Sequence, residues 1–385
     1  MRQGTGFANK GLTLRRALLR TARYHLADLL GFRVRPRKLR LVATKRCNAR
    51  CLMCSAWKGV NPSASEIDPD EIRTIAQRNR HFLARVTHLS VTGGEPTLRR
   101  DLVELVRALT DSFPRASLNI NTNGFDTRRI VTVARKILGF RRRLTVMVSV
   151  DGLGEVHNTI RGVRGVFPHV VETIDQLIAL RERNGKVRVE INFVLTNRNS
   201  DQMLPVFHFC REREVAFNPI YPVYGQLYEN DEAEIGLERH AVRRFLRDLF
   251  EIQQADGALA LRELEHQLRG FPRDFDCWAG RTILFVESDA RVFPNGGCPP
   301  IFCLGNLREF GYSFAALLRS PNAQQVLRRL RTCRLCRLPC ESMTTLSGPE
   351  ALAGYRKIHR PDAYPTSGEL PTPHLVEHPP RQRTP

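Results

Sequence analysis

The chain has 385 residues, 42% of them hydrophobic, so it can bury a sizeable core in one or two domains. Its formal net charge is +21, but only seven of its 60 basic residues are lysine, and its basic patches lack interleaved aromatic residues. This pattern argues against a nucleic-acid surface. No apolar run approaches the ~20 residues that span a bilayer, and no signal peptide is visible. We therefore expect a cytoplasmic protein whose ten cysteines ligate metal instead of forming disulfides.

The sequence divides into segments of different character. Residues 1–38 carry a basic amphipathic pattern over Leu12 to Leu30, which predicts a helix that covers the neighbouring domain; contact with a membrane surface is the less favoured alternative. Residues 39–228 form the expected core domain, and the charged, helical residues 229–275 are expected to bridge it to residues 276–345. The proline-rich residues 361–385 are predicted to be disordered.

Short strand patterns alternate with helical patterns in residues 39–228, which predicts βαβ units and a parallel sheet of the α/β class. The predicted strands are Leu39–Thr44, His88–Thr92, Ser117–Asn121, Leu144–Val150, Val187–Thr196 and Val215–Ile220. The predicted helices are Pro69–Arg80, Asp101–Asp111, Thr127–Leu138, Pro168–Arg183 and Asp201–Arg213. Active sites of parallel α/β barrels lie at the C-terminal ends of the strands, so residues that follow each strand are the candidates.

Three cysteines follow the first predicted strand with the spacing C-x₃-C-x₂-C: Cys47, Cys51 and Cys54. A structural zinc site has four ligands, so three thiolates with no fourth nearby leave one metal position open. Soft thiolates on a tight loop suit an iron–sulfur cluster, in which three cysteines leave one iron free to bind a small molecule. Buried structural thiols or a partial zinc knuckle are the plainer alternatives.

Further motifs follow in order at the ends of predicted strands. Gly93-Gly94-Glu95-Pro96 follows the second strand, Thr122-Asn123-Gly124 follows the third, and the fourth ends in Ser149-x-Asp151-Gly, with His157 and Arg161 beyond it. Two adjacent glycines let the backbone approach a ligand closely. Taken alone, the glycines would indicate an ordinary turn. Together with the cysteines, this order resembles the radical S-adenosylmethionine (SAM) superfamily over roughly residues 39–220.

The resemblance implies a partial (β/α)₆ barrel and a [4Fe–4S] cluster on Cys47, Cys51 and Cys54, whose fourth iron binds SAM. It also implies contacts to SAM: Gly93, Gly94 and Glu95 for the amino group, Ser149 and Arg161 for the carboxylate, and Asn121 and Asp151 for the ribose or the site wall. The family often has an aromatic residue before the third cysteine. Met53 stands there in this chain, so Trp57 is the alternative aromatic face for adenine.

The segment 276–345 holds six of the ten cysteines. The features of this segment follow in a fixed order: cysteine, predicted hairpin, cysteine, Gly-Asn-Leu, helix and C-x₂-C. This order resembles the twitch domain, a shortened SPASM extension of radical SAM enzymes. The resemblance implies a small C-terminal β-hairpin/helix domain with one auxiliary [4Fe–4S] cluster on Cys277, Cys298, Cys333 and Cys336. Cys303 or Cys340 could replace one of these ligands, and a zinc ribbon on the same four cysteines is the alternative.

We therefore expect a radical SAM oxidoreductase that cleaves SAM reductively to a 5′-deoxyadenosyl radical, which abstracts hydrogen from the substrate. The auxiliary cluster favours net oxidation of a small metabolite such as a sugar or aminocyclitol; a redox-neutral epimerisation or rearrangement is the alternative. Peptide crosslinking is less favoured, because residues 1–38 are too short for a peptide-recognition domain. A non-catalytic iron–sulfur or zinc regulator would leave the glycine and serine motifs unexplained. No catalytic side chain is identified, and the expected electron donor is a flavodoxin or ferredoxin.

Overall fold

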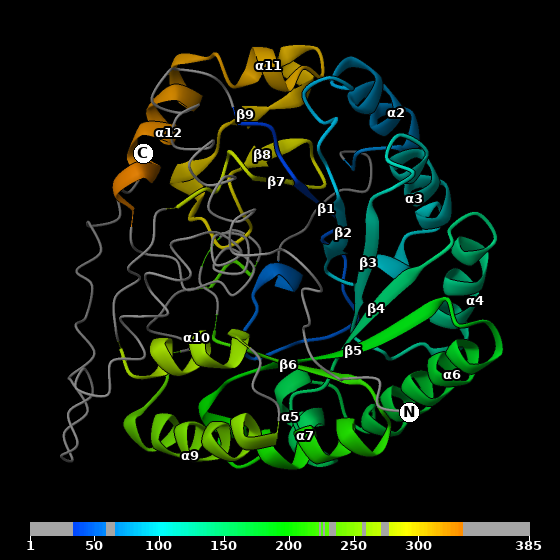
Figure 1. Cartoon of the computed structure of the whole chain (residues 1–385), viewed down its shortest axis with the longest axis vertical. Helices are drawn as coiled ribbons and strands as arrows, with labels where there is room; N and C mark the ends of the chain where they lie inside the picture. Colours follow the sequence, from blue (N-terminus) through cyan, green and yellow to red (C-terminus); the bar gives the residue numbers. More distant parts are fainter. Residues whose placement is uncertain are drawn as a thin grey trace.

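Six parallel strands form a curved sheet with helices on its outer side (Figure 1). The computed structural model describes residues 34–58, 66–222, 225, 228–230, 236–255, 259–270 and 277–333. The strands are β1 (Lys38–Thr44), β2 (His88–Gly93), β3 (Ser117–Thr122), β4 (Leu144–Ser149), β5 (Val187–Val194) and β6 (Ala216–Ile220). The outer helices are α2 (Pro69–Arg78), α3 (Leu102–Asp111), α4 (Thr127–Leu138), α6 (Phe167–Asn184) and α7 (Met203–Glu212). This arrangement confirms the α/β partial-barrel fold expected from the sequence.

The apolar side chains at alternate positions of the strands pack the sheet against the helices. Leu89 and Val91 of β2 are fully buried, and Leu118 and Ile120 of β3 are nearly so. All four belong to one core cluster with residues of α3, α4 and α6, because successive side chains of a strand point to opposite faces. Truncating such a side chain to Ala costs about 2–5 kcal/mol. A shift of one residue in the pairing of a strand would turn all its apolar side chains to the opposite face of the sheet. Burial of these side chains therefore also fixes the register of the sheet.

The first turn of α2 links the core to the C-terminal part of the chain. Asp68 is the N-cap and accepts hydrogen bonds from the Asp70 and Glu71 N–H groups, while the Glu71 carboxylate accepts from the Asp68 N–H. This capping box satisfies N–H groups that the helix itself leaves free. The same Glu71 carboxylate accepts from Arg308 Nε (2.7 Å) and the Tyr312 hydroxyl (2.8 Å). One acidic side chain therefore both starts the helix and anchors the segment around residue 310.

Three more strands extend the sheet, in the order β1-β7-β8-β9. β7 (Ile283–Val286) pairs in parallel with β1, whereas β8 (Arg291–Phe293) and β9 (Gly305–Asn306) are antiparallel. The predicted hairpin is present as β7 and β8, but its first strand continues the barrel sheet, which the sequence did not indicate. Helices α11 (Phe314–Leu317) and α12 (Pro321–Thr332) follow it, with 3₁₀ turns at Pro300–Phe302 and Leu307–Phe310.

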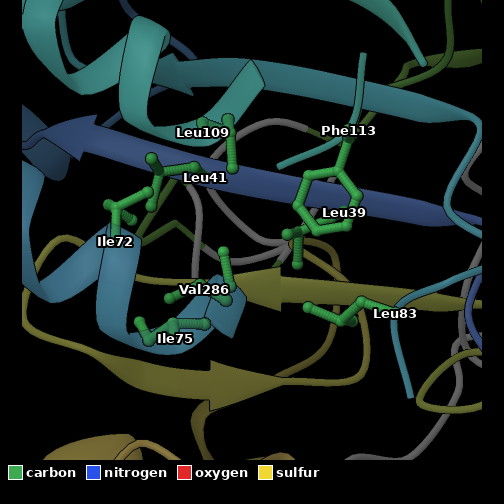
Figure 2. A pocket seen from close by; sticks show the side chains of 9 residues that line it. Leu39, Leu41, Ile72, Ile75, Leu83, Leu109, Phe113 and Val286 are labelled. Carbon is green, nitrogen blue, oxygen red and sulfur yellow. The ribbon is translucent and has the colours of Figure 1, made fainter. Parts of the chain in front are cut away.

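A small apolar pocket lies between β1, β7 and the outer helices. Figure 2 shows Leu39 and Leu41 of β1 and Val286 of β7 close to Ile72 and Ile75 of α2. Every lining side chain is a hydrocarbon, so this pocket is a packing gap in the core and offers no group for chemistry.

Helix α5 (Glu155–Arg161) was not predicted; it lies between Gly154 (φ 56°) and Gly162 (φ 66°). The charged segment after residue 229 forms α9 (Arg239–Ala255) and α10 (Leu259–Leu268), as predicted. The helix predicted over residues 12–30 and the tail 361–385 lie outside the described residues. Within the ranges given above, no helix is both long and apolar enough to cross a membrane.

Candidate active site

The loop after β1 carries Cys47, Cys51 and Cys54, each partly buried. The Cys54 N–H donates to the Cys51 carbonyl (3.2 Å), and the Ala49 N–H donates to Cys47 Sγ (3.4 Å). Burial raises the pKa of Cys47 to about 11 and that of Cys54 to about 12, with a contribution from the neighbouring thiols. Without metal, the Cys47 and Cys54 thiols are therefore protonated at neutral pH, and metal ligation would release their protons.

The spacing of these thiols differs from that of a simple metal site. Among the residues that the structure describes, no three His, Cys, Asp or Glu side chains converge as a single ion requires. Cysteines that ligate a cubane bind different irons and stand farther apart than ligands of one ion. Three thiols on one loop, close enough to influence one another's ionisation, fit such a cluster.

The Gly-Gly-Glu-Pro segment supports the cysteine loop from one side. The Gly94 N–H donates to the Thr44 carbonyl and the Glu95 N–H to the Arg46 carbonyl, both at 2.8 Å. A Cβ atom on Gly94 would lie 2.2 Å from the Arg46 carbonyl oxygen. Gly93 has φ 142° and would meet the Thr44 carbonyl oxygen at the same 2.2 Å. The two glycines therefore let this segment pack directly on the backbone that leads into the cysteines, a role that the sequence did not reveal.

Helix α5 holds the other side of the loop. The Arg50 N–H donates to the Arg161 carbonyl (2.8 Å), and the Leu52 N–H donates to the Ile160 carbonyl (2.9 Å). A Cβ atom on Gly162 would lie 2.3 Å from the Arg50 carbonyl oxygen. Met53 is buried against Ile160, so it anchors the loop into the protein. The left-handed glycines that bound α5 were the signal that could have located this support.

Glu95 is 1% exposed, and its carboxylate is surrounded by donors from its own and the next strand end. It accepts hydrogen bonds from the Thr97 N–H and hydroxyl, the Thr122 hydroxyl and the Asn123 N–H. Asn123 also donates to the Asn48 side chain (2.7 Å), which lies in the cysteine loop. Glu95, expected to hold the SAM amine, therefore joins the ends of β2 and β3, and the loop is tied to both.

Arg161 and Asp151 form a buried ion pair, with Nη2 2.6 Å from Oδ2. The other guanidinium nitrogen, Nη1, lies 3.5 Å from Cys51 Sγ. Asp151 Oδ1 accepts from the Val194 N–H (2.8 Å). Burial alone would lower the pKa of Arg161, but the Asp151 carboxylate raises it above its usual value. A permanently charged guanidinium therefore stands beside the middle cysteine.

The other expected SAM contacts lie at the ends of their strands. Asn121 Nδ2 donates to Thr92 Oγ1 (3.1 Å), and its buried Oδ1 has no partner in the part of the chain that the structure describes. Ser149 is half-buried at the end of β4. Trp57, in the 3₁₀ turn Ala56–Lys58, has the Arg50 guanidinium 4.9 Å from its ring centroid.

The C-terminal cysteines surround β7 and β8 in sequence. Cys277 and Cys298 are buried, whereas Cys303 and Cys333 are partly exposed. Cys303 packs against the small apolar cluster of Val42, Phe285 and Phe293, and Cys333 packs against the main core. Cys336 and Cys340 lie outside the described residues.

Comparisons with known proteins agree with this site. The radical SAM superfamily profile matches residues 41–210. The chain is 32% identical over 273 residues to a probable GTP 3′,8-cyclase of Metallosphaera sedula, covering 69% of this chain and 75% of that protein. It is 26% identical over 302 residues to the AdoMet-dependent heme synthase of Methanosarcina barkeri, covering 71% and 80%. The chain belongs to the radical SAM superfamily.

Two solved structures share the fold. The structure of native anSMEcpe with bound AdoMet superposes with a TM-score of 0.57 at 20% identity, covering 78% of this chain and 88% of that one. SuiB of Streptococcus suis bound to S-adenosylmethionine gives 0.53 at 19% identity, covering 72% of this chain and 64% of that one. Membership of the superfamily implies a [4Fe–4S] cluster and SAM, and the three-thiol loop fits that cluster.

Proposed function

We propose that Cys47, Cys51 and Cys54 ligate a [4Fe–4S] cluster and that the protein is a radical SAM enzyme acting on a small molecule. The arrangement of the loop carries this proposal: three partly buried thiols lie between the Gly-Gly-Glu-Pro segment and α5, beside the Arg161 guanidinium. When bound, the cluster supplies the electron for reductive cleavage of SAM to methionine and a 5′-deoxyadenosyl radical, which takes a hydrogen atom from the substrate.

Residues around the cysteine loop are placed to position SAM. Backbone groups of Gly93 and Gly94 are offered to the SAM amine, and Ser149 to its carboxylate. Arg161 supplies positive charge for the same carboxylate while it stays paired with Asp151. Asn121 presents its unpartnered Oδ1 as an acceptor for a ribose hydroxyl. Glu95 acts on SAM through the backbone that it holds, since its own carboxylate is already satisfied.

The C-terminal cysteines extend the proposal to an auxiliary cluster on Cys277, Cys298, Cys333 and Cys336. Such a cluster would receive the electron left on the substrate radical, which makes the net reaction an oxidation and the enzyme an oxidoreductase. A reductant of the flavodoxin or ferredoxin type would supply the first electron. The main competing functions are a cyclisation, as the name of the Metallosphaera relative describes, and peptide modification.

The test is SAM cleavage by anaerobically reconstituted protein. With dithionite, the wild type should release 5′-deoxyadenosine, and Cys51→Ala should release none. Cys210→Ala is the matched control, because it removes a buried thiol of α7 that packs in the main core. If Cys51→Ala cleaves SAM as the wild type does, the proposal is wrong.

A further inference from the structure

The inner face of the sheet, opposite the helices, is polar. Parallel sheets covered on both sides usually carry apolar residues on both faces, and barrel interiors are usually filled by bulky branched side chains. In β2, β3 and β4 most apolar residues face the helices, and the alternate positions hold hydroxyls and amides apart from His88 and Met147. These inward-facing residues are Ser90, Thr92, Asn119, Asn121, Thr145 and Ser149. Most are half-buried, whereas their outward neighbours are buried, so the inner face keeps polar groups within reach.

The register of the strands aligns these side chains in layers. One layer runs across five strands through Arg40, Ser90, Asn119, Thr145 and Arg188. The next contains Asn121, Met147, Glu190 and Ala216. A third, at the C-terminal ends of the strands, contains Ser149, Asn192 and Asn218. The third layer is at the same end of the sheet as the cysteine loop.

The amides of this face are paired, but each keeps unused hydrogen-bonding capacity. Asn119 Nδ2 donates to Ser90 Oγ (3.0 Å) and to Met147 Sδ (3.3 Å), and Asn218 Nδ2 donates to Asn192 Oδ1 (2.8 Å). An Asn side chain has two N–H donors and an acceptor oxygen with two lone pairs. Asn121 Oδ1, the proposed acceptor for the SAM ribose, lies on the same face and is buried with no partner among the described residues. A packed core would not retain such groups, because buried polar atoms are normally satisfied.

Charge is scarce on this face although the chain has a net charge of +21. The inward residues of β3, β4 and β6 are all uncharged. On β5, Glu190 is paired with Arg188 at 2.7 Å, so the two charges offset each other. Arg40 of β1 lies in the first layer, away from the end of the sheet that carries the cysteine loop. The residues named in the second and third layers include no charge other than Glu190, so this part of the face suits neither a polyanion nor a large apolar ring system.

On the basis of the proposed function, we infer that this inner face binds the substrate. The bound part of the substrate is an uncharged ring that carries several neighbouring hydrogen-bond donors and acceptors. A cyclitol and the base and sugar of a nucleoside share this chemistry. Asn119, Asn192 and Asn218 determine the specificity, because such a ring would engage the side-chain oxygens of Asn119 and Asn218 and the Nδ2 group of Asn192.

The experiment is calorimetric titration of the reconstituted, SAM-loaded protein with three probes: myo-inositol, guanosine and GTP. At least one of the two uncharged probes should bind with a Kd of about 1 mM or tighter. Inositol binding identifies a polyol substrate, and guanosine binding identifies a nucleoside.

The variants Asn119→Leu and Asn192→Leu should weaken that binding about tenfold or more, because each removes polar contacts while keeping a side chain that branches at Cγ. Gln254→Leu makes the same exchange on the exposed side of α9 and should bind as the wild type does. Asn192→Asp keeps the shape and tests the same contacts where Leu prevents folding, which a thermal melt would show.

Three results would overturn the inference: neither uncharged probe binds, GTP binds more than about tenfold tighter than guanosine, or the Asn variants bind as Gln254→Leu does. Failure of the proposed function is distinct, since wild-type protein would then not cleave SAM at all. SAM cleavage without probe binding therefore rejects only this inference.

Discussion

Arg161 and Asp151 form a buried ion pair at 2.6 Å, and the same guanidinium reaches Cys51 Sγ at 3.5 Å. Asp151 follows β4, Arg161 ends α5, and Cys51 lies in the loop after β1. The ion pair therefore fixes the distance between a strand end and the cysteine loop. It also places a positive charge beside Cys51, one of the proposed cluster ligands.

Replacing Arg161 by Gln should have two separable effects. Asp151 would be left as an unpaired buried carboxylate, which costs about 3–5 kcal/mol of stability. Loss of the donor to Cys51 should lower the reduction potential of the loaded cluster, because hydrogen bonds to cluster sulfurs help to set it. EPR-monitored redox titration and thermal unfolding measure the two effects.

The double variant Arg161→Gln/Asp151→Asn separates these effects. It should recover much of the stability, since no charge is then buried alone, but it should keep the lowered potential. If Arg161→Gln alone leaves the reduction potential of the cluster unchanged, Arg161 does not act on the cluster.

Gly94→Ala should impair cluster loading as well as SAM binding. The sequence alone predicts that Gly94 lets the backbone approach SAM, so a larger side chain there would impair SAM binding. The structure instead places the new Cβ 2.2 Å from the Arg46 carbonyl oxygen, so the cysteine loop would have to move. Iron bound per chain after reconstitution should fall well below the wild-type value. Gly139→Ala, at the end of α4, is the control and should load normally.

His157 should make the protein acid-sensitive. Burial, followed by the nearby Arg161, lowers its pKa to about 3, and its Nδ1 accepts from the Asp151 N–H (3.2 Å). The unfolded chain binds a proton below about pH 6.5 while the folded chain does not, so stability falls as the pH drops from about 6.5 toward 3. The contribution of His157 is up to about 1.4 kcal/mol per pH unit. The free energy of unfolding, measured by chemical denaturation between pH 6 and 4, should therefore change less steeply with pH in His157→Asn than in the wild type. Equal slopes would contradict the prediction.

Cys333→Ala tests the proposed auxiliary cluster. The wild type should bind about eight irons, and the variant about half of that. With deuterated substrate, both proteins should transfer the label to 5′-deoxyadenosine, but only the wild type should form oxidised product. Zinc instead of the second four irons would identify a zinc ribbon. Normal turnover by Cys333→Ala would make the site structural and the reaction redox-neutral.

Local patterns were sufficient to predict the barrel and the order of its motifs. Runs such as Leu144–Ser149 are apolar at alternate positions, and the polar residues that follow them mark the strand ends. The supports of the site were not predictable in this way. Gly94 and Gly162 act through close packing on the backbone of distant residues, and no local pattern contains that information.

Two further features required the assembled sheet. The alternation in residues 117–121 showed which residues are polar, but it did not show that Asn119 would align with Ser90 and Thr145 on one face. The pairing of β7 with β1 joins segments far apart in the chain, where a hairpin pattern predicts only the pairing of β7 with β8.

The pairing of Leu41 with Val286 has a consequence for how the protein is made. The ribosome adds roughly 240 residues after β1 before the strand that covers its free edge exists. During that time β1 presents unpaired N–H and C=O groups, which invite pairing with other chains. Contacts between segments so distant in sequence also slow folding. Because the cysteine loop begins where β1 ends, this open edge leads directly to the site until synthesis has passed β7. Nascent chains that stall earlier would be exposed to aggregation through this edge.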